Sequence, residues 1–343
     1  MSDINPFLTI CIPSYNRPRE LLRLLESIDC DPEQIEILVC EDHSPKRDAI
    51  AAIVSKFAAA SSYTLRYHEN EKNLGFDGNI RNLVASARGK FIIFMGDDDL
   101  FIKGALDQFI DFLYRHQEYP YVLRSYIAIH ENGTVEKFRY LPETTVIPAG
   151  ENSVAWLFKR SVSLSGFTIL RESANKVSTS DLDGTLLYQV YLMSETCLSN
   201  DSVFCEFPVT QAWQTFRDDY QMFGNSEAER SRFKPGAVSE DNSINFTMAY
   251  FEVAAYLDKK HGTSLEDKIR LQISKYSYPF LSIQRKKGIS HFLHYAHRLE
   301  SDLGLGISGY FHCYKWGLVL FGERLCDRLI ILVKRLIGHT PDL

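Results

Sequence analysis

The sequence predicts an α/β protein: a mostly parallel, Rossmann-like sheet followed by a helical C-terminal portion. In the first third of the chain, short apolar runs alternate with segments that place leucine or alanine at helical spacing. Beyond about residue 225 the strand pattern stops, and long helical patterns follow one another. Alternation of the first kind is typical of βαβ units, which have helices on both faces of a parallel sheet.

The alternating part contains four strand–helix repeats. Apolar runs rich in Ile, Val and Phe predict strands, and the leucine- or alanine-rich segments between them predict helices. The strands are expected at residues 7–15, 35–42, 63–70 and 90–99, and the helices at 18–28, 48–60, 78–89 and 104–116.

From about residue 121 the alternation weakens. Residues 121–142 read as a strand, an Asn-Gly turn and a returning strand. A helix at 150–160, a strand at 165–173, a helix at 184–195 and a strand at 202–214 follow. The C-terminal helices are expected at 239–261, 265–285, 289–302 and 318–337.

Composition excludes several classes of protein. A net charge of −6 provides no basic surface for nucleic acid. The seven cysteines include no C-x-x-C pair, which argues against a disulfide framework or a zinc site and favours the reducing cytoplasm. The first residues do not resemble a signal peptide, and no apolar run is long enough to span a membrane.

Polar residues follow three of the predicted strands. Pro13-Ser14-Tyr15-Asn16 ends the first strand, Glu41-Asp42-His43-Ser44 the second, and Asp97-Asp98-Asp99 the fourth. Ligands of open parallel sheets bind outside the carboxyl ends of the strands. Three adjacent carboxylates repel one another, and Mg²⁺ or Mn²⁺, which binds carboxylates together with phosphate oxygens, would offset that repulsion.

Two other interpretations of the aspartates are a helix cap and a phosphotransferase site. One aspartate could merely cap the next helix, although three are more than a cap needs. A phosphotransferase would also use strand-end aspartates, but its nucleophile is expected after the first strand, where Pro13-Ser14-Tyr15-Asn16 stands.

Three stretches together resemble a known family. They are ICIPSYNRPRELLRLLESI (10–28), EILVCEDHSP (36–45) and NLGFDGNIRNLVASARGKFIIFMGDDD (73–99). They are similar to the nucleotide-sugar half of GT-A glycosyltransferases of family 2, especially abequosyltransferase-like enzymes of bacterial surface polysaccharide (O-antigen, lipopolysaccharide or capsule) synthesis. The resemblance covers residues 7–116 and implies a GT-A fold.

The resemblance implies roles for particular residues. Asp42 would bond the base or ribose, and Asp98 would hold Mn²⁺ or Mg²⁺ on the diphosphate with Asp97 or Asp99 in support. Gly96-Asp97-Asp98 stands where the family usually has Asp-Ala-Asp, so a shift of one position stays open. The other residues assigned to the nucleotide sugar are Pro13, Ser14, Tyr15, Asn16, Arg17, Asn73, Gly75 and Asn79.

The resemblance also requires a general base in the second half of the domain. Tyr188-Gln189 stands where the family has a Glu-Asp pair, so Asp181 and Asp183 are the nearest candidates. Either could instead be the N-cap of the 184–195 helix. Glu195 and Asp218-Asp219 are weaker candidates, and Arg217 would reach the diphosphate unless it is only a solvated side chain.

The implied function is metal-dependent, inverting transfer of a hexosyl or deoxyhexosyl group from a nucleotide sugar to a saccharide acceptor, expected to be polyprenyl-linked. Residues 1–120 would be the nucleotide-sugar-binding half, 121–224 the acceptor-binding half, and 225–343 a helical region. The alternative is a non-catalytic sugar-nucleotide or carbohydrate-binding module, consistent with the missing Glu-Asp pair.

The predicted helix at 318–337 is amphipathic. Its charged residues fall within an arc of roughly 140°, bases outnumber acids on that arc, and leucine dominates the opposite side. Such a stripe could rest on the inner face of the cytoplasmic membrane, or pack on the core or on a second subunit of a homo-oligomer. The sequence leaves these alternatives open.

Overall fold

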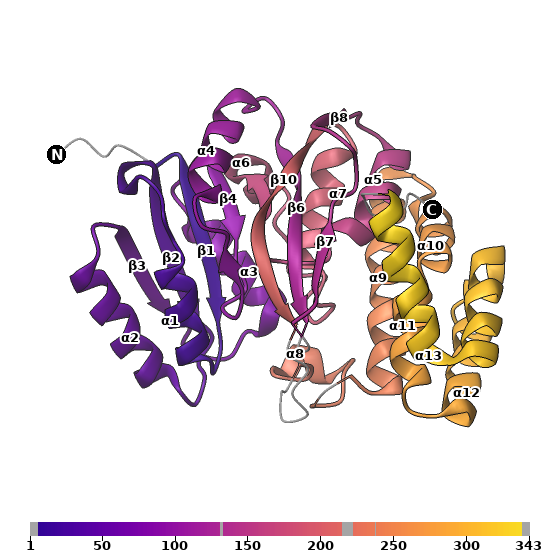
Figure 1. Cartoon of the computed structure of the whole chain (residues 1–343). Helices are drawn as coiled ribbons and strands as arrows, with labels where there is room; N and C mark the ends of the chain where they lie inside the picture. The colour runs from indigo at the N-terminus through magenta and orange to yellow at the C-terminus, as the bar shows by residue number, and fades with distance from the viewer. Residues whose placement is uncertain (1–5, 131–132, 215–221, 237, 338–343) are drawn as a thin grey trace.

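The computed structural model describes residues 6–130, 133–214, 222–236 and 238–337. A single sheet runs through the N-terminal two thirds in the order β3-β2-β1-β4-β9-β6-β10-β5, and a group of helices follows it along the chain (Figure 1). This arrangement confirms the predicted α/β class with a helical C-terminal portion.

The first half of the sheet consists of parallel strands joined by helices. β1 pairs with β2 and β4, and β2 pairs with β3, in each case parallel. The elements up to α4 are β1 (Leu8–Ser14), α1 (Pro18–Glu26), β2 (Ile35–Glu41), α2 (Arg47–Ala60), β3 (Thr64–Glu69), α3 (Gly75–Ser86), β4 (Phe91–Phe94), β5 (Leu100–Phe101) and α4 (Ala105–Arg115). Of these, β5 belongs to the other end of the sheet, where it pairs antiparallel with β10.

The second half of the sheet is mixed. β9 runs antiparallel to β4 and β6, whereas β6 and β10 are parallel. The predicted returning strand is confirmed, because β7 pairs antiparallel with β6, whereas Asn132 of the predicted Asn-Gly turn lies outside the described residues. The elements are β6 (Tyr121–His130), β7 (Val135–Phe138), β8 (Thr145–Ile147), α5 (Glu151–Phe158), β9 (Phe167–Leu170), α6 (Arg171–Lys176), α7 (Tyr188–Cys197) and β10 (Ser202–Gln214).

Apolar side chains form a core on each face of the sheet. On one face, residues such as Leu21 of α1, Ile50 of α2 and Phe109 of α4 pack against the strands. On the other face, Leu83 of α3 and Leu192 of α7 join a larger cluster that extends into the C-terminal helices. The central strands are therefore covered on both sides, which explains their continuous apolar sequences.

The start of α7 differs from the prediction. The helix begins at Tyr188 rather than at residue 184, so neither Asp181 nor Asp183 is its N-cap. The carboxylate of Asp77, from α3, instead accepts hydrogen bonds from the backbone N–H groups of Gly184, Leu186 and Tyr188 at 2.8–3.0 Å. Asp77, which is distant in sequence, thus accepts the hydrogen bonds of backbone N–H groups that usually bond to a nearby capping residue.

The C-terminal region is helical as predicted, with two differences. The 265–285 segment is two helices, because Pro279 lacks an N–H and fits only the first turn of a helix. The last helix begins earlier and is broken at Gly322 (φ 72°, ψ 171°). The elements are α8 (Glu227–Arg230), α9 (Glu240–His261), α10 (Leu265–Lys275), α11 (Tyr278–Arg285), α12 (Ile289–Ser301) and α13 (Gly309–Ile337).

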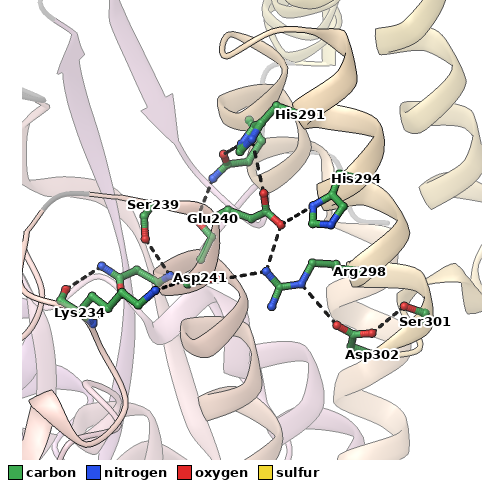
Figure 2. A network of polar contacts seen from close by, with 12 residues as sticks. Lys234, Ser239, Glu240, Asp241, His291, His294, Arg298, Ser301 and Asp302 are labelled. Atoms are coloured by element: carbon green, nitrogen blue, oxygen red, sulfur yellow. Dashed lines mark hydrogen bonds and ion pairs between the residues drawn. The ribbon is translucent and has the colours of Figure 1, made fainter.

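A polar network ties α12 to the beginning of α9 (Figure 2). Glu240 contacts the Nδ1 atoms of His291 and His294 at 3.4 and 2.9 Å, and it accepts a 3.0 Å bond from Arg298. Arg298 also bonds Asp241 at 3.0 Å. The C-terminal helices are thus attached to one another by charged contacts as well as by apolar packing.

Candidate functional site

The structure brings the ends of β1 and β4 together. The backbone N–H of Tyr15 donates to Asp97 Oδ2 at 3.2 Å, and Arg17 Nη1 donates to Asp97 Oδ1 at 2.7 Å. The same guanidinium contacts Asp98 Oδ2 at 2.8 Å. Because β1 and β4 are parallel neighbours, residues about eighty positions apart in sequence meet at one edge of the sheet.

Arg17 offsets part of the negative charge of the three aspartates. Burial, with added repulsion from Asp98, raises the pKa of Asp97 to about 6 and that of Asp99 to about 7. The side chain of Asp98 is 39% exposed, whereas that of Asp97 is 5% exposed. Asp98 is therefore the member of the run that is most open to a ligand from solvent.

Asp99 is fixed by the second half of the sheet. The hydroxyl of Ser165, just before β9, donates to Asp99 Oδ2 and accepts a 3.0 Å bond from the N–H of Gly96. The backbone N–H of Trp213, near the end of β10, donates to Asp99 Oδ1 at 3.1 Å. Both contacts fix the acidic run against the predicted acceptor-binding half.

Arg124 of β6 fixes the backbone of the segment that carries Ser165. Its guanidinium is buried and donates to the carbonyl oxygens of Ser163 and Ser165. The neighbouring Gly166 has φ +85°, and a Cβ there would lie 2.9 Å from Arg124 Nε. The sequence does not predict a role for Ser165 or Arg124 at the site. The one indication is an arginine within a mostly apolar predicted strand.

Asp42 closes β2 at the same edge and binds the start of α3. Its carboxylate accepts hydrogen bonds from Asn70 Nδ2 at 2.8 Å and from the N–H groups of Leu74 and Gly75 at 2.8 and 2.9 Å. Burial raises the pKa of Asp42, and these hydrogen bonds oppose the increase. Asp42 therefore has a structural role besides any contact with a nucleotide.

The predicted residues around the start of α3 also lie in this region. Asn73 Oδ1 accepts from the N–H of Gly75, and Asn79 Nδ2 donates to the carbonyl of Cys40 on β2. Gly75 has φ +76°, and a Cβ there would collide with Ser226 Oγ at 2.3 Å. Glycine is thus required where the turn before α8 approaches α3.

The turn after β1 presents polar groups without partners among the described residues. Ser14 Oγ and Asn16 Oδ1 are buried and make no hydrogen bond there. Asn16 has φ 64°, a conformation that asparagine tolerates better than most residues. Pro13, next to last in β1, is half-buried. Buried polar atoms usually have a partner, so this turn suits a hydrogen-bonding ligand.

The predicted base candidates bond residues of α3 and α9. Asp183 forms a two-point ion pair with Arg81 of α3, and Asp181 accepts a 3.1 Å bond from Tyr256 of α9. Among the described residues, no hydrogen bond or ion pair joins either carboxylate to Asp97, Asp98 or Asp99.

The remaining predicted candidates divide into two groups. Glu195 is buried and paired with Lys260 at 2.8 Å and His261 at 3.0 Å, so it serves the contact between α7 and α9. Arg217, Asp218 and Asp219 lie outside the described residues.

The acidic run fits a divalent cation that is shared with a ligand. Within the described ranges, no three acidic, histidine or cysteine side chains converge as a closed metal site would require. Mg²⁺ and Mn²⁺ sites in phosphate-binding enzymes commonly use one or two carboxylates, with water and phosphate oxygens completing the shell. Asp98, exposed beside Asp99, matches that chemistry.

Comparison with known proteins agrees with this geometry. Residues 9–177 match the family model described as "Glycosyl transferase family 2". That range begins in β1, includes the acidic run and Ser165, and ends just after α6.

Two curated relatives are bacterial sugar transferases. The chain is 29% identical over 100 residues to abequosyltransferase RfbV of Salmonella typhimurium, which is 29% of this chain and 30% of that protein. It is 29% identical over 102 residues to the GalNAc(5)-diNAcBac-PP-undecaprenol beta-1,3-glucosyltransferase of Campylobacter jejuni, covering 29% and 32% of the two chains. The matches thus span less than a third of either relative.

Solved structures show the same fold over most of the chain. S. aureus TarS 1-349 in complex with UDP-GlcNAc has a TM-score of 0.52 at 16% identity, covering 94% of this chain and 91% of that one. Mannosyltransferase PcManGT from Pyrobaculum calidifontis, in complex with GDP-Man and Mn²⁺, has a TM-score of 0.50 at 13% identity, covering 95% and 89%. The predicted GT-A fold is therefore confirmed.

Proposed function

Because residues 9–177 form a glycosyl transferase family 2 domain, we propose that the protein transfers a sugar from a nucleotide-sugar donor to a hydroxyl of a saccharide acceptor. The main support for the proposal is one set of contacts between the β1 turn and the acidic run. The backbone N–H of Tyr15 and the guanidinium of Arg17 both donate to Asp97. Ser14 Oγ and Asn16 Oδ1, which are buried without a hydrogen-bond partner among the described residues, and Arg17, which contacts the Asp98 carboxylate, support the proposal further.

Each part of this site has a chemical task in the proposal. The β1 turn and the Asp42 region hold the nucleotide, and Asp98, supported by Asp97 or Asp99, holds the divalent cation. A bound Mn²⁺ or Mg²⁺ would neutralise charge on the departing diphosphate. Arg17 supplies a second positive charge at the same edge, and Ser165 keeps Asp99 in place.

The finer features of the reaction are also proposals. An inverting mechanism needs a carboxylate on the acceptor side of the sugar ring, for which Asp181 and Asp183 are the candidates. A polyprenyl-linked saccharide acceptor, in surface polysaccharide synthesis at the cytoplasmic face of the membrane, is supported by the undecaprenol-linked substrate in the name of the Campylobacter relative.

A donor panel tests the proposal. UDP-, GDP-, CDP- and dTDP-sugars are each incubated with the protein, with and without Mn²⁺, and binding is followed by thermal shift and turnover by release of nucleotide. We expect one donor class to raise the melting temperature and to be turned over only with metal. Binding without turnover, with saccharide acceptors supplied, would instead identify a binding module.

Replacing Asp42 tests the nucleotide pocket. If the carboxylate bonds the base or ribose, Asp42→Ala should weaken nucleotide affinity by about 1.5–3 kcal/mol, as expected for a hydrogen bond to a charged group. The variant also loses the acceptor for Leu74 and Gly75, so calorimetry is paired with thermal unfolding. Unchanged affinity in a folded variant would place the nucleotide elsewhere.

Replacing the two base candidates tests the acceptor side. If Asp181 or Asp183 removes the acceptor proton, its Asn variant should bind donor normally but lose about 100-fold or more in kcat. Asp183→Asn also weakens the ion pair with Arg81, and Arg81→Gln is the matched control for that structural effect. Full activity in both Asn variants would direct the search to Glu195 or Asp218-Asp219.

A further inference from the structure

The second segment of α13, residues 323–337, carries an exposed apolar stripe. The exposed fractions are 46% for Leu325, 50% for Leu329, 52% for Leu332, 44% for Val333 and 78% for Leu336. At 100° per residue these five side chains fall within an arc of about 100°. The stripe therefore does not pack on the α/β core, which was one of the alternatives left open by the sequence.

The side of this segment that includes Cys326, Glu323 and Asp327 faces the protein. Asp327 accepts hydrogen bonds from Tyr278 at 2.6 Å and from Ser282 at 2.8 Å, both on α11. Cys326 is buried, and the side chain of Glu323 is only 23% exposed. The helix is thus oriented by polar contacts with α11, beside which it lies as the brightest yellow helix of Figure 1. In this orientation its leucines are exposed.

Exposure of large apolar side chains is concentrated on this element. Of the twenty such side chains that are exposed among the described residues, nine belong to α13. Trp316, Leu320 and Phe321, just before the break at Gly322, are 54%, 72% and 60% exposed. A concentration of exposed apolar side chains on one element marks a docking site rather than the scattered apolar residues of an ordinary surface.

The charges beside the stripe favour a lipid surface as its occupant. Arg324 and Arg328 are exposed on one edge of the stripe, whereas Asp327 bonds α11 and the less exposed Glu323 lies 3.9 Å from Arg324 Nε. Outward bases and inward acids complement anionic headgroups, although the whole chain has a net charge of −6.

We propose that residues 323–336 dock the protein on an anionic membrane surface, with the leucine stripe in the interface and the arginines among the headgroups. The segment after Gly322 is about 22 Å long at 1.5 Å per residue, which is shorter than a bilayer core. No helix in the described part of the chain is long and apolar enough to cross a membrane. The helix would therefore lie along the surface. The inference does not depend on the proposed glycosyl transfer.

Vesicle binding by the full chain tests the proposal. Phosphatidylcholine vesicles with and without 30% phosphatidylglycerol are mixed with the protein and sedimented. We expect binding to the anionic vesicles, and the double variant Leu329→Glu/Leu332→Glu should reduce the partition coefficient at least about tenfold. Arg324→Gln/Arg328→Gln should reduce the preference for anionic lipid and leave weak binding to neutral vesicles.

A matched control separates this site from general loss of surface hydrophobicity. Met248→Glu/Leu271→Glu places the same charges at exposed apolar positions of α9 and α10 and should bind vesicles like the parent. Circular dichroism confirms folding of each variant. Equal binding by the parent and the Leu329/Leu332 variant would overturn the proposal. Absence of vesicle binding, together with dimers that this variant dissociates in light scattering, would overturn it in favour of a second copy.

Discussion

Asp98→Ala is expected to abolish metal-dependent turnover while leaving the protein folded. The Asp98 carboxylate is the most exposed of the acidic run, and it lies against Arg17 at the edge where β1 and β4 end. Removing one fixed group that stabilises transition-state charge typically lowers kcat by about 100- to 1,000-fold. The fold should tolerate the change, because the side chain is 39% exposed and fills no core position.

The experiment compares turnover of the donor identified by the panel over a range of Mn²⁺ concentrations. Asp111→Ala, an exposed aspartate of α4, is the matched control and should behave as the parent. Asp98→Asn separates charge from shape, because it keeps the size of the side chain but removes the negative charge. Unchanged turnover of Asp98→Ala at every Mn²⁺ concentration would remove the metal-site proposal.

Much of the fold was predictable because its signals are local. The buried parallel strands are continuous apolar runs, the hairpin of β6 and β7 is marked by Asn-Gly, and the helices between strands have clear apolar periodicity. The start of α7 was not predictable in this way. Its amides are satisfied by Asp77, 111 positions before Tyr188, and nothing in the nearby sequence reveals that contact.

The same distinction applies to the candidate site. The positions of Asp42 and of the acidic run at one sheet edge follow from the order of the strands. The sequence, however, predicts a metal alone to offset the aspartates, whereas Arg17 pairs with two of them. Ser165 reaches Asp99 across 66 positions, so its role also appears only when β9 lies beside β4.

Asp77→Ala is expected to lower the free energy of unfolding by about 3–5 kcal/mol. The side chain is 1% exposed and accepts from three backbone N–H groups at the start of α7. Each buried donor left without a partner costs about 1–3 kcal/mol. Urea unfolding followed by circular dichroism measures the loss, and Asp48→Ala, an exposed aspartate of α2, is the control that should change little. A loss below about 1 kcal/mol would contradict the anchoring role.

The contribution of Asp77 to stability should also depend on pH. Burial, with repulsion from Asp183 and Glu229, raises the pKa of Asp77 to about 7 in the folded protein, from 3.8 in an exposed chain, against the hydrogen bonds from Leu186 and Tyr188. Between these two pKa values the folded state holds a proton that the unfolded state releases. The contribution of Asp77 to the free energy of unfolding is therefore fully present below about pH 4 and is lost as pH rises through 7.

Asp77→Asn stays uncharged throughout this range and isolates the effect. We expect the difference in unfolding free energy, parent minus Asp77→Asn, to decrease from pH 5 to about pH 7 and to level off by pH 8. Other titrating groups act on both proteins and cancel in the difference, apart from Asp183 and Glu229, which interact with Asp77 directly. A difference that stays constant over this range would show that Asp77 is ionised throughout, with its three hydrogen bonds outweighing the cost of burial.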